Sequence, residues 1–226
     1  MGDQIVKCYA NSMLSRYMPK GKTFEDLSFH PERLDQIKEA KKPSGIFIDS
    51  TSDLFGVGVP EEWTQAVLDA VARYPQHVFF SLTKNAARIP KFKIPFNLWC
   101  GVSAPATFMF GRELTPERQL QWFDLSLRAL CKSDALVKWV SIEPLSIDVS
   151  VQLEKYSEHL DWAVIGAGSM GKFAFQPTTQ TLINVREALK GIPVFFKGNM
   201  SPKVAEEVFG EWPDHFPDPD ICLQEP

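Results

Sequence analysis

The stretch WAVIGAGS, residues 162–169, decides the fold because four apolar residues run directly into four small ones. A short apolar run without polar alternation is typical of a strand that is buried on both faces. Further stretches of the chain share this layout. They are GIFIDS (45–50), HVFFSLTK (77–84), LWCGVS (98–103), VKWVSIEP (137–144) and IPVFFKG (192–198). The sequence therefore predicts six buried strands.

Amphipathic segments separate these strands and predict helices over 60–74, 115–131 and 177–191. The first begins at Pro60, the second has Thr115 as its cap, and the third closes at Gly191. Residues 8–18 predict another helix. Strands that alternate with helices form a parallel sheet, which is either open or closed into a barrel.

Small or polar residues stand at the end of nearly every predicted strand. An open, doubly wound sheet concentrates its site at one switch point, whereas a barrel builds its site from the ends of several strands. We therefore predict an α/β fold, a partial (β/α) TIM-like barrel of about six parallel strands. Residues 1–226 are expected to form one domain with a Pro/Asp-rich tail at about 211–226.

Composition is that of a globular protein, with 44% hydrophobic and 23% charged residues. The net charge of −4 gives no indication of nucleic-acid binding. There is no apolar run long enough for a membrane span and no signal-peptide pattern at the N-terminus. The four cysteines are scattered and form no Cys-x-x-Cys pair, so reduced thiols and a cytoplasmic location are expected.

The glycines of GAGSMGK (166–172) fit two nucleotide-binding patterns. A dinucleotide turn needs its third glycine to open a helix, but KFAFQP follows Gly171 and Pro177 is the better helix start. A P-loop needs a Ser or Thr where Phe173 stands. We favour a glycine-rich turn between strand and helix, whose free N–H groups suit a carboxylate or phosphate.

Several blocks occur together in the order and spacing of one known family, among them SDLF (52–55), SIEPL (141–145) and FFK (195–197). On these blocks the chain resembles a phage- and prophage-associated set of radical-SAM-like proteins, mostly of unassigned substrate, over about residues 8–200. The resemblance implies a partial barrel that opens with a first strand and a three-cysteine loop ending in Cys-x-x-Cys-Tyr-Ala. It also implies a four-iron–four-sulfur (4Fe–4S) cluster whose open iron binds S-adenosylmethionine.

The chain departs from that family at the cysteine loop. Cys8 matches the last cysteine, Ile5 stands where the middle one is expected, and the first cysteine with its strand would precede Met1. One thiolate cannot hold a cluster that takes three or four. The resemblance thus leaves Cys8 as a lone metal-ligand candidate, and alone it also fits a small buried hydrophobe. We expect the first strand to be missing or replaced.

Glu143, Lys197 and Lys84 are the candidate catalytic residues, because each follows a buried strand. Glu143 is expected to point into the barrel mouth or to pair with one of the two lysines, and such a pair is a candidate acid/base couple. Two lysines at one mouth would favour an anionic ligand.

The aromatic residues Phe108, Phe110, Phe173 and Phe175 are expected in loops after strands. The candidate cofactor-binding residues are Asp49, Ser50, Asp53, Ser103, Ser141, Gly166, Gly168 and Ser169. Asp49 and Asp53 fit a ligand amine or the capping of a turn equally well.

Three functions remain open on the sequence. The first is a radical-SAM-like barrel that lacks most cluster ligands and binds S-adenosylmethionine or another nucleoside or anion at its mouth. The second is a non-catalytic binding or scaffold protein of the same fold. The third is a nucleotide-binding enzyme that uses the GAGSMGK turn. The expected partners are a small-molecule or nucleoside ligand and a tail segment or second copy of the chain that covers the open edge of the barrel.

Overall fold

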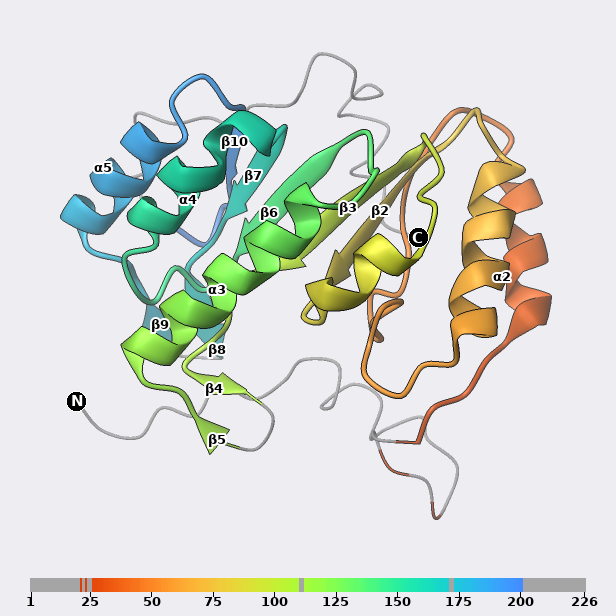
Figure 1. Ribbon diagram of the computed structural model, residues 1–226, viewed down its shortest axis with the longest axis horizontal. Helices are drawn as coiled ribbons and strands as arrows, with labels where there is room; N and C mark the ends of the chain where they lie inside the picture. Colours follow the sequence, from red (N-terminus) through yellow and green to blue (C-terminus); the bar gives the residue numbers. More distant parts are fainter. Residues whose placement is uncertain (1–20, 22, 24–25, 110–111, 171–172, 201–226) are drawn as a thin grey trace.

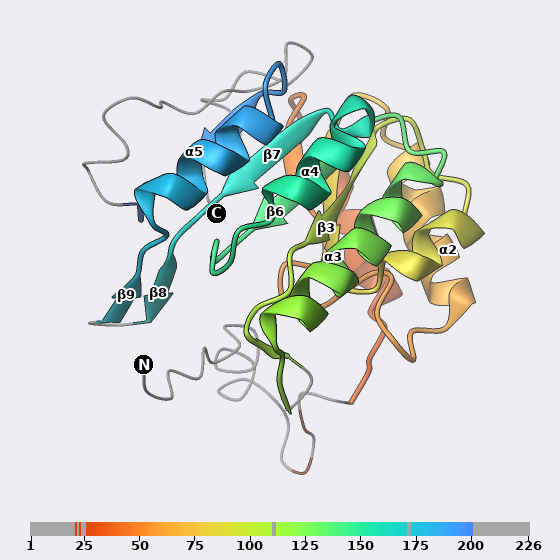
Figure 2. The same cartoon turned by 60° about the vertical axis from the view of Figure 1, so that its left-hand side comes forward.

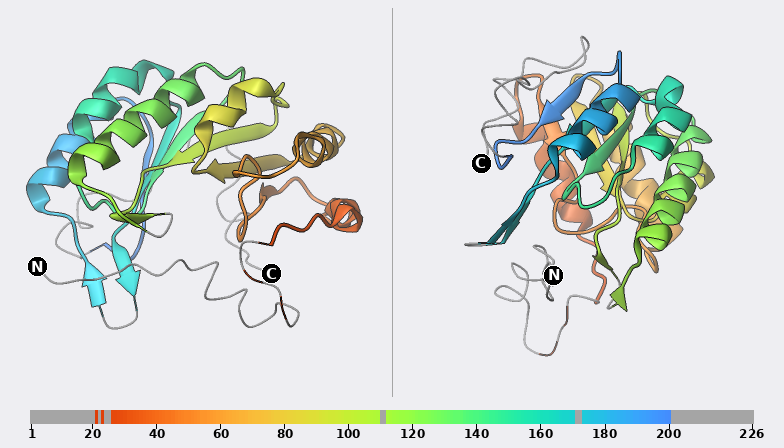
Figure 3. Two further views of the ribbon diagram at one scale, coloured as in Figure 1. Left: turned by 60° about the horizontal axis from the view of Figure 1, so that its bottom comes forward. Right: turned by 90° about the vertical axis from the view of Figure 1, so that its left-hand side faces the viewer.

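A six-stranded parallel sheet forms the centre of the computed structural model, which describes residues 21, 23, 26–109, 112–170 and 173–200. The sheet contains β1 (Gly45–Phe47), β2 (Val78–Thr83), β3 (Leu98–Ser103), β6 (Lys138–Ile142), β7 (Trp162–Ile165) and β10 (Val194–Phe196). Spatial order equals chain order, and every neighbouring pair is parallel. The sheet curls into a half-barrel with helices on its outer side (Figures 1 and 3). The predicted α/β partial barrel is confirmed.

Helices connect the strands and pack on the convex side of the sheet. They are α2 (Glu61–Ala72), α3 (Pro116–Cys131), α4 (Ser150–Tyr156) and α5 (Thr179–Ala188). Short 3-10 helices are η1 (Pro31–Glu39), η2 (Ala86–Lys91) and η3 (Ser157–His159). The hydroxyls of Thr115 and Thr178 accept the backbone N–H groups of Arg118 and Thr181, which caps α3 and α5. Figure 2 shows α3, α4 and α5 lying side by side.

All six predicted strands lie within the ranges expected from sequence, and three of the predicted helices are found as α2, α3 and α5. The sequence did not predict α4 or the 3-10 helices. The helix expected at 8–18 and the tail at about 211–226 lie outside the described residues. In the described parts of the chain, no helix is long and apolar enough to cross a membrane.

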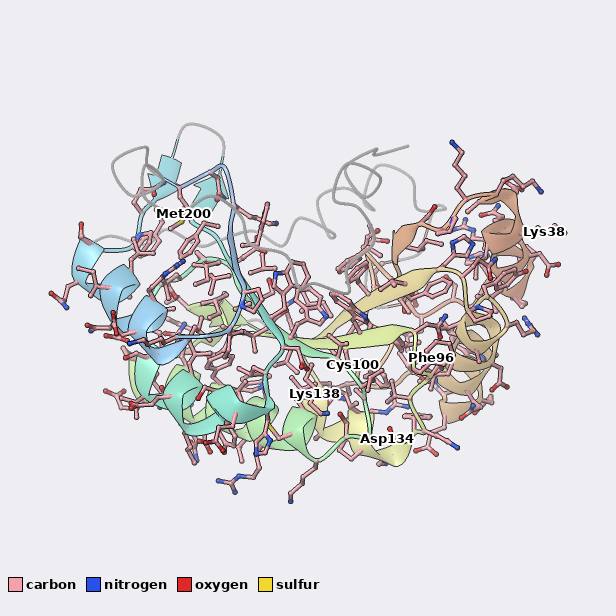
Figure 4. All side chains as sticks on the ribbon, turned by 90° about the horizontal axis from the view of Figure 1, so that it is seen from above. Lys38, Phe96, Cys100, Asp134, Lys138 and Met200 are labelled. Carbon is pink, nitrogen blue, oxygen red and sulfur yellow. The ribbon has the colours of Figure 1, made fainter. Side chains whose placement is uncertain are left out.

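Two separate hydrophobic cores cover the two faces of the sheet. On the convex face, Phe79, Cys100 and Val140 pack with Phe123 and Leu127 of α3. Figure 4 shows Cys100 on this helix-covered side. On the concave face a second cluster consists of buried aromatic and aliphatic side chains. Its members are Phe80, Trp99, Val137, Trp139, Trp162 and Val164. The lower part of the barrel interior is therefore filled by the protein's own side chains.

Two short antiparallel hairpins extend from the edge at which the strands end (Figure 1). One pairs β4 (Phe108–Met109) with β5 (Arg112–Glu113), and the other pairs β8 (Gly168–Met170) with β9 (Phe173–Phe175). The expectation that Phe108, Phe173 and Phe175 lie in loops is therefore wrong, and Phe110 lies outside the described residues. The apolar-run criterion overlooks FAF because this strand is only three residues long.

The hairpin β8–β9 also corrects the expected glycine turn. From Gly168 the chain pairs antiparallel with β9, and α5 starts only at Thr179. A dinucleotide or P-loop turn delivers its last glycine directly into a helix. GAGSMGK does not do so: Gly166 directly follows β7, and Gly168 begins the strand β8 of the hairpin.

Candidate functional site

The carboxyl ends of the parallel strands form one continuous edge of the half-barrel. An open α/β sheet binds ligands where its strand order reverses. The order β1-β2-β3-β6-β7-β10 contains no reversal, so no switch point exists in this sheet. The candidate site is therefore the concave rim formed by several strand ends, as in a barrel.

The strand register places the polar candidates on the concave side of this rim. Ser103 pairs in register with Ser141, Ser141 with Val164, and Val164 with Phe195. Side chains two residues apart share one face of a sheet. Two positions beyond Ser141, Val164 and Phe195 stand Glu143, Gly166 and Lys197, which are neighbours above the aromatic cluster.

Glu143 is the centre of the polar contacts at this rim. Its Oε2 lies 2.7 Å from Nζ of Lys197, and its Oε1 accepts a hydrogen bond of 3.0 Å from the hydroxyl of Ser141. The side chains of Glu143 and Lys197 are 26% and 46% exposed, so solvent and ligands reach the pair. The predicted pairing of Glu143 with a lysine is found with Lys197.

Gly166 makes this ion pair possible. It directly follows β7, the strand between β6 and β10, and a Cβ at its position would be 3.0 Å from Cγ and 3.2 Å from Oε2 of Glu143. The absent side chain lets Glu143 reach over β7 to Lys197. The backbone supports this arrangement, because N–H of Gly166 donates to Ile142 and N–H of Lys197 donates to Ile165.

Asn199 holds the next layer of the rim and was not predicted from the sequence. Its amide nitrogen donates to the carbonyl of Ala167 at 2.7 Å, and its Oδ1 accepts the Ala167 N–H at 3.2 Å. A side-chain amide can form both bonds at once because it carries a donor and an acceptor. The signal available in the sequence was its place in KGNM, directly after a buried strand.

Gly168 and Ser169 lie in β8, past the rim. A Cβ at Gly168 would be 3.1 Å from Cβ of Phe175 and 3.4 Å from Cβ of Pro144, so this glycine allows close packing of the hairpin. Ser169 pairs in register with Ala174 of β9. The structure thus places Gly166 against Glu143 and places Gly168 in the hairpin beside Pro144.

The loop after β1 holds Asp49, Ser50 and Asp53. Asp49 has a φ of 58°, and its carboxylate accepts the hydroxyl of Ser52 at 2.9 Å. Burial raises the pKa of Asp49, the Ser52 hydrogen bond opposes this shift, and the charge of Asp53 adds to it. Ser50 is exposed.

Asp53 shows the turn-capping role that the sequence left open. One carboxylate oxygen accepts N–H of Phe55 at 3.0 Å, and the other accepts N–H of Lys84 at 2.9 Å. Its two oxygens therefore tie the loop after β1 to the end of β2.

The Lys84 side chain lies apart from the Glu143 pair. It lines a hollow of about 620 Å³ together with residues of η2 and α3, Arg118 and Trp122 among them. The only ion pair that Glu143 forms within the described residues is the one with Lys197. The structure brings Lys197 and Ser141 to Glu143, and among the described residues it shows no ion pair between Glu143 and Lys84.

The described cysteines lie away from the rim. Cys100 is fully buried in the convex core, and burial raises the pKa of its thiol to about 12. Cys131 is partly buried at the end of α3, and burial raises the pKa of its thiol. Cys8 and Cys222 are outside the described residues. Within the part of the chain that the structure covers, no group of three or more His, Cys, Asp or Glu is placed to hold a metal ion.

One family model, described as Protein of unknown function (DUF5131), matches residues 2–208. No curated protein and no solved structure matches the chain. The matched range includes every strand of the half-barrel and the whole of the polar rim. The family description assigns no activity, so function has to be inferred from the geometry of the rim.

Proposed function

The chain belongs to the DUF5131 family, and we propose that this member binds a zwitterionic nucleoside of the S-adenosylmethionine type at the carboxyl edge of its half-barrel. The observation that carries the proposal is the Glu143–Lys197 pair over Gly166. It presents one negative and one positive group, both partly exposed, on the concave side of the rim. The amino acid part of S-adenosylmethionine carries a carboxylate and an ammonium group, so each can pair with the oppositely charged group of the rim.

Exchange of ion-pair partners gives such a ligand a low-cost way to bind. The ligand carboxylate takes Lys197 and its ammonium takes Glu143, so neither protein charge is left unpaired. Because both side chains are partly exposed, each also keeps part of its hydration during the exchange. The Ser141 hydroxyl, 3.0 Å from Glu143 Oε1, keeps the carboxylate oriented during the exchange.

The nucleoside part of the ligand is supported by the sequence resemblance. The blocks SIEPL and FFK, which carry the likeness to phage-associated radical-SAM-like proteins, contribute Ser141, Glu143 and Lys197 to the rim. Small residues at Gly166 and Ala167 leave the β7 end of this rim without bulky side chains. Both points favour S-adenosylmethionine over a free amino acid.

The 4Fe–4S cluster implied by the same resemblance does not fit these residues. A cluster takes three or four thiolates. Of the four cysteines, Cys100 lies in the convex core with its thiol held neutral, and Cys131 ends α3 away from the rim. Only two cysteines remain in residues 1–226. We therefore propose only that the chain binds this ligand.

Calorimetric titration with S-adenosylmethionine, methionine and adenosine tests the proposal. Wild type is expected to bind S-adenosylmethionine more tightly than either fragment. Glu143→Gln and Lys197→Met should each weaken binding about tenfold or more, the loss expected for one charge-assisted hydrogen bond. Lys84→Met is the matched control and should leave affinity unchanged. A wild type that binds none of the three, or equal losses in all variants, would contradict the proposal.

Absorption spectra after anaerobic iron–sulfur reconstitution test the statement on the cluster. We expect no broad visible band from the purified chain, because two thiolates are too few. A stable band that disappears in Cys8→Ala would show that the cluster forms after all.

An assembly surface is the second candidate function, favoured by the exposed side of β1. Phe47 on this outer strand is 46% exposed, although its ring packs edge-on against Trp139 with 6.5 Å between the ring centroids. Strands at the ends of a sheet carry unpaired backbone groups that another chain can join. Sedimentation of wild type and Phe47→Ser checks this candidate. A shift from dimer to monomer in the variant would support it, and a monomeric wild type would exclude self-assembly.

A further inference from the structure

A hollow of about 620 Å³ lies between η2 and α3, on the outer side of the half-barrel. Its walls are the turn that follows β2 and one side of α3. The lining residues are Lys84, Asn85, Ala86, Ala87, Leu114, Arg118, Gln121, Trp122, Leu125 and Ser126. Figures 1 and 2 show α3 running along the outside of the sheet. The volume is within the range of small-molecule sites.

The charge of this hollow is positive. Lys84 and Arg118 are both exposed and both line it, and none of the other lining residues is acidic. Neither side chain forms an ion pair with any residue in the described ranges. Two exposed cations that line one hollow suit an anionic group such as a phosphate.

The floor of the hollow is apolar. Trp122 and Leu125 lie outside both hydrophobic cores, and Leu125 is 52% exposed. They share one side of α3 with Arg118 and Gln121, since these positions are three and four residues apart. An indole beside aliphatic surface offers a planar ring a place to stack.

Specific hydrogen bonds hold both walls in place. On the β2 side, Asp53 accepts N–H of Lys84, and the Asn85 amide donates to the carbonyl of Phe55 at 2.8 Å. On the helix side, the buried Gln119 amide donates to the carbonyl of Pro105 at 3.1 Å. A site whose walls are already fixed loses little conformational entropy on binding.

We propose that this hollow binds a nucleoside phosphate, with the phosphate between Lys84 and Arg118 and the base against Trp122 and Leu125. The ligand class follows from the combination of two exposed cations with a partly exposed indole. The site is separate from the Glu143–Lys197 rim and does not depend on the function proposed for it.

Titration calorimetry with AMP, ADP, adenosine and inorganic phosphate tests this site on the full chain. We expect AMP and ADP to bind more tightly than adenosine or phosphate alone. Arg118→Gln and Lys84→Gln remove exposed charges without touching the core, and each should weaken AMP binding about tenfold. Leu125→Ala should weaken AMP and adenosine and leave phosphate unchanged.

Two controls separate this site from other sources of binding. Lys132→Gln removes an exposed charge just after α3, outside the hollow, and should leave AMP affinity unchanged. Glu143→Gln should also have no effect on AMP, whereas it weakens S-adenosylmethionine at the rim. Absence of AMP binding to wild type, equal affinity for phosphate and AMP, or unchanged affinity in Arg118→Gln would each overturn the proposal.

Discussion

The indole of Trp139 lies directly over Gly101, its register partner on the neighbouring strand β3. A Cβ at Gly101 would be 2.3 Å from Cε2 and 2.6 Å from Nε1 of the indole. The indole N–H also donates to the carbonyl of Trp99 at 3.2 Å. This pair sets how the aromatic cluster fills the concave face, because the largest side chain occupies the space that the glycine leaves.

Gly101→Ala is therefore expected to destabilise the protein by about 1–3 kcal/mol, the usual cost of overpacking a core. Urea unfolding followed by circular dichroism measures the loss. Gly198→Ala is the control, because a Cβ there meets nothing within 4 Å. In a Trp139→Leu background the Gly101→Ala change should cost much less. Equal costs in both backgrounds would show that the indole is not the obstacle.

Gly166→Ala should affect ligand binding more than stability. The added methyl would be 3.0 Å from Cγ of Glu143, so the carboxylate must move away from Lys197. Because the ion pair is partly exposed, we expect a loss of less than about 1 kcal/mol in unfolding free energy. Affinity for S-adenosylmethionine should fall about tenfold in calorimetry. In a Glu143→Gln background the same substitution should have little further effect.

Asp124 should make stability fall in acid. The hydrogen bond from Lys155 lowers the pKa of Asp124, and Tyr156 and Arg128 lower it further. A folded pKa below the unfolded value means that the stabilisation is complete above the unfolded pKa of about 3.9 and is lost as pH falls through the folded pKa. Wild type should thus lose more unfolding free energy than Asp124→Asn between about pH 5 and pH 2.5. Parallel curves for the two proteins would contradict this expectation.

His77 should make stability fall at a higher pH. It is fully buried, burial lowers its pKa, and its Nδ1 accepts N–H of Ser44 at 3.2 Å. The unfolded chain takes up a proton first, so stability is complete above about pH 6.5 and declines as pH falls below that value. His77→Gln should lack this decline in urea titrations at pH 8 and about pH 5.5. His159→Gln, at an exposed position, should retain it.

The sequence predicts the sheet well because its strands are buried on both faces. Stretches such as 98–103 and 162–169 can be predicted as strands from their local apolar runs alone. The hairpins were missed because β4 and β5 are two residues long, β8 and β9 are three residues long, and β8 begins at Gly168. The 3-10 helix η2 was missed because it contains Pro90, which reads as a loop residue.

The choice between Lys84 and Lys197 as the partner of Glu143 was beyond the sequence. Each lysine follows a strand two places away from β6. On the β10 side the intervening residue is Gly166, whereas Pro105 stands at the corresponding position after β3. Strand order and register reveal that difference, and neither can be read from the sequence alone.

Because spatial order follows chain order, the half-barrel behaves as a one-dimensional array of strand–helix units. Each inner strand bonds to the units before and after it, and β1 and β10 each bond to one neighbour in the sheet. Linear arrays of this kind lose structure from their ends, as repeat proteins do. Amide hydrogen exchange should accordingly be slowest in β3 and β6 and progressively faster toward β1 and β10. The rim pair Glu143–Lys197 spans from a slowly exchanging strand to a rapidly exchanging one, so a ligand bound there would slow the opening of the outer unit.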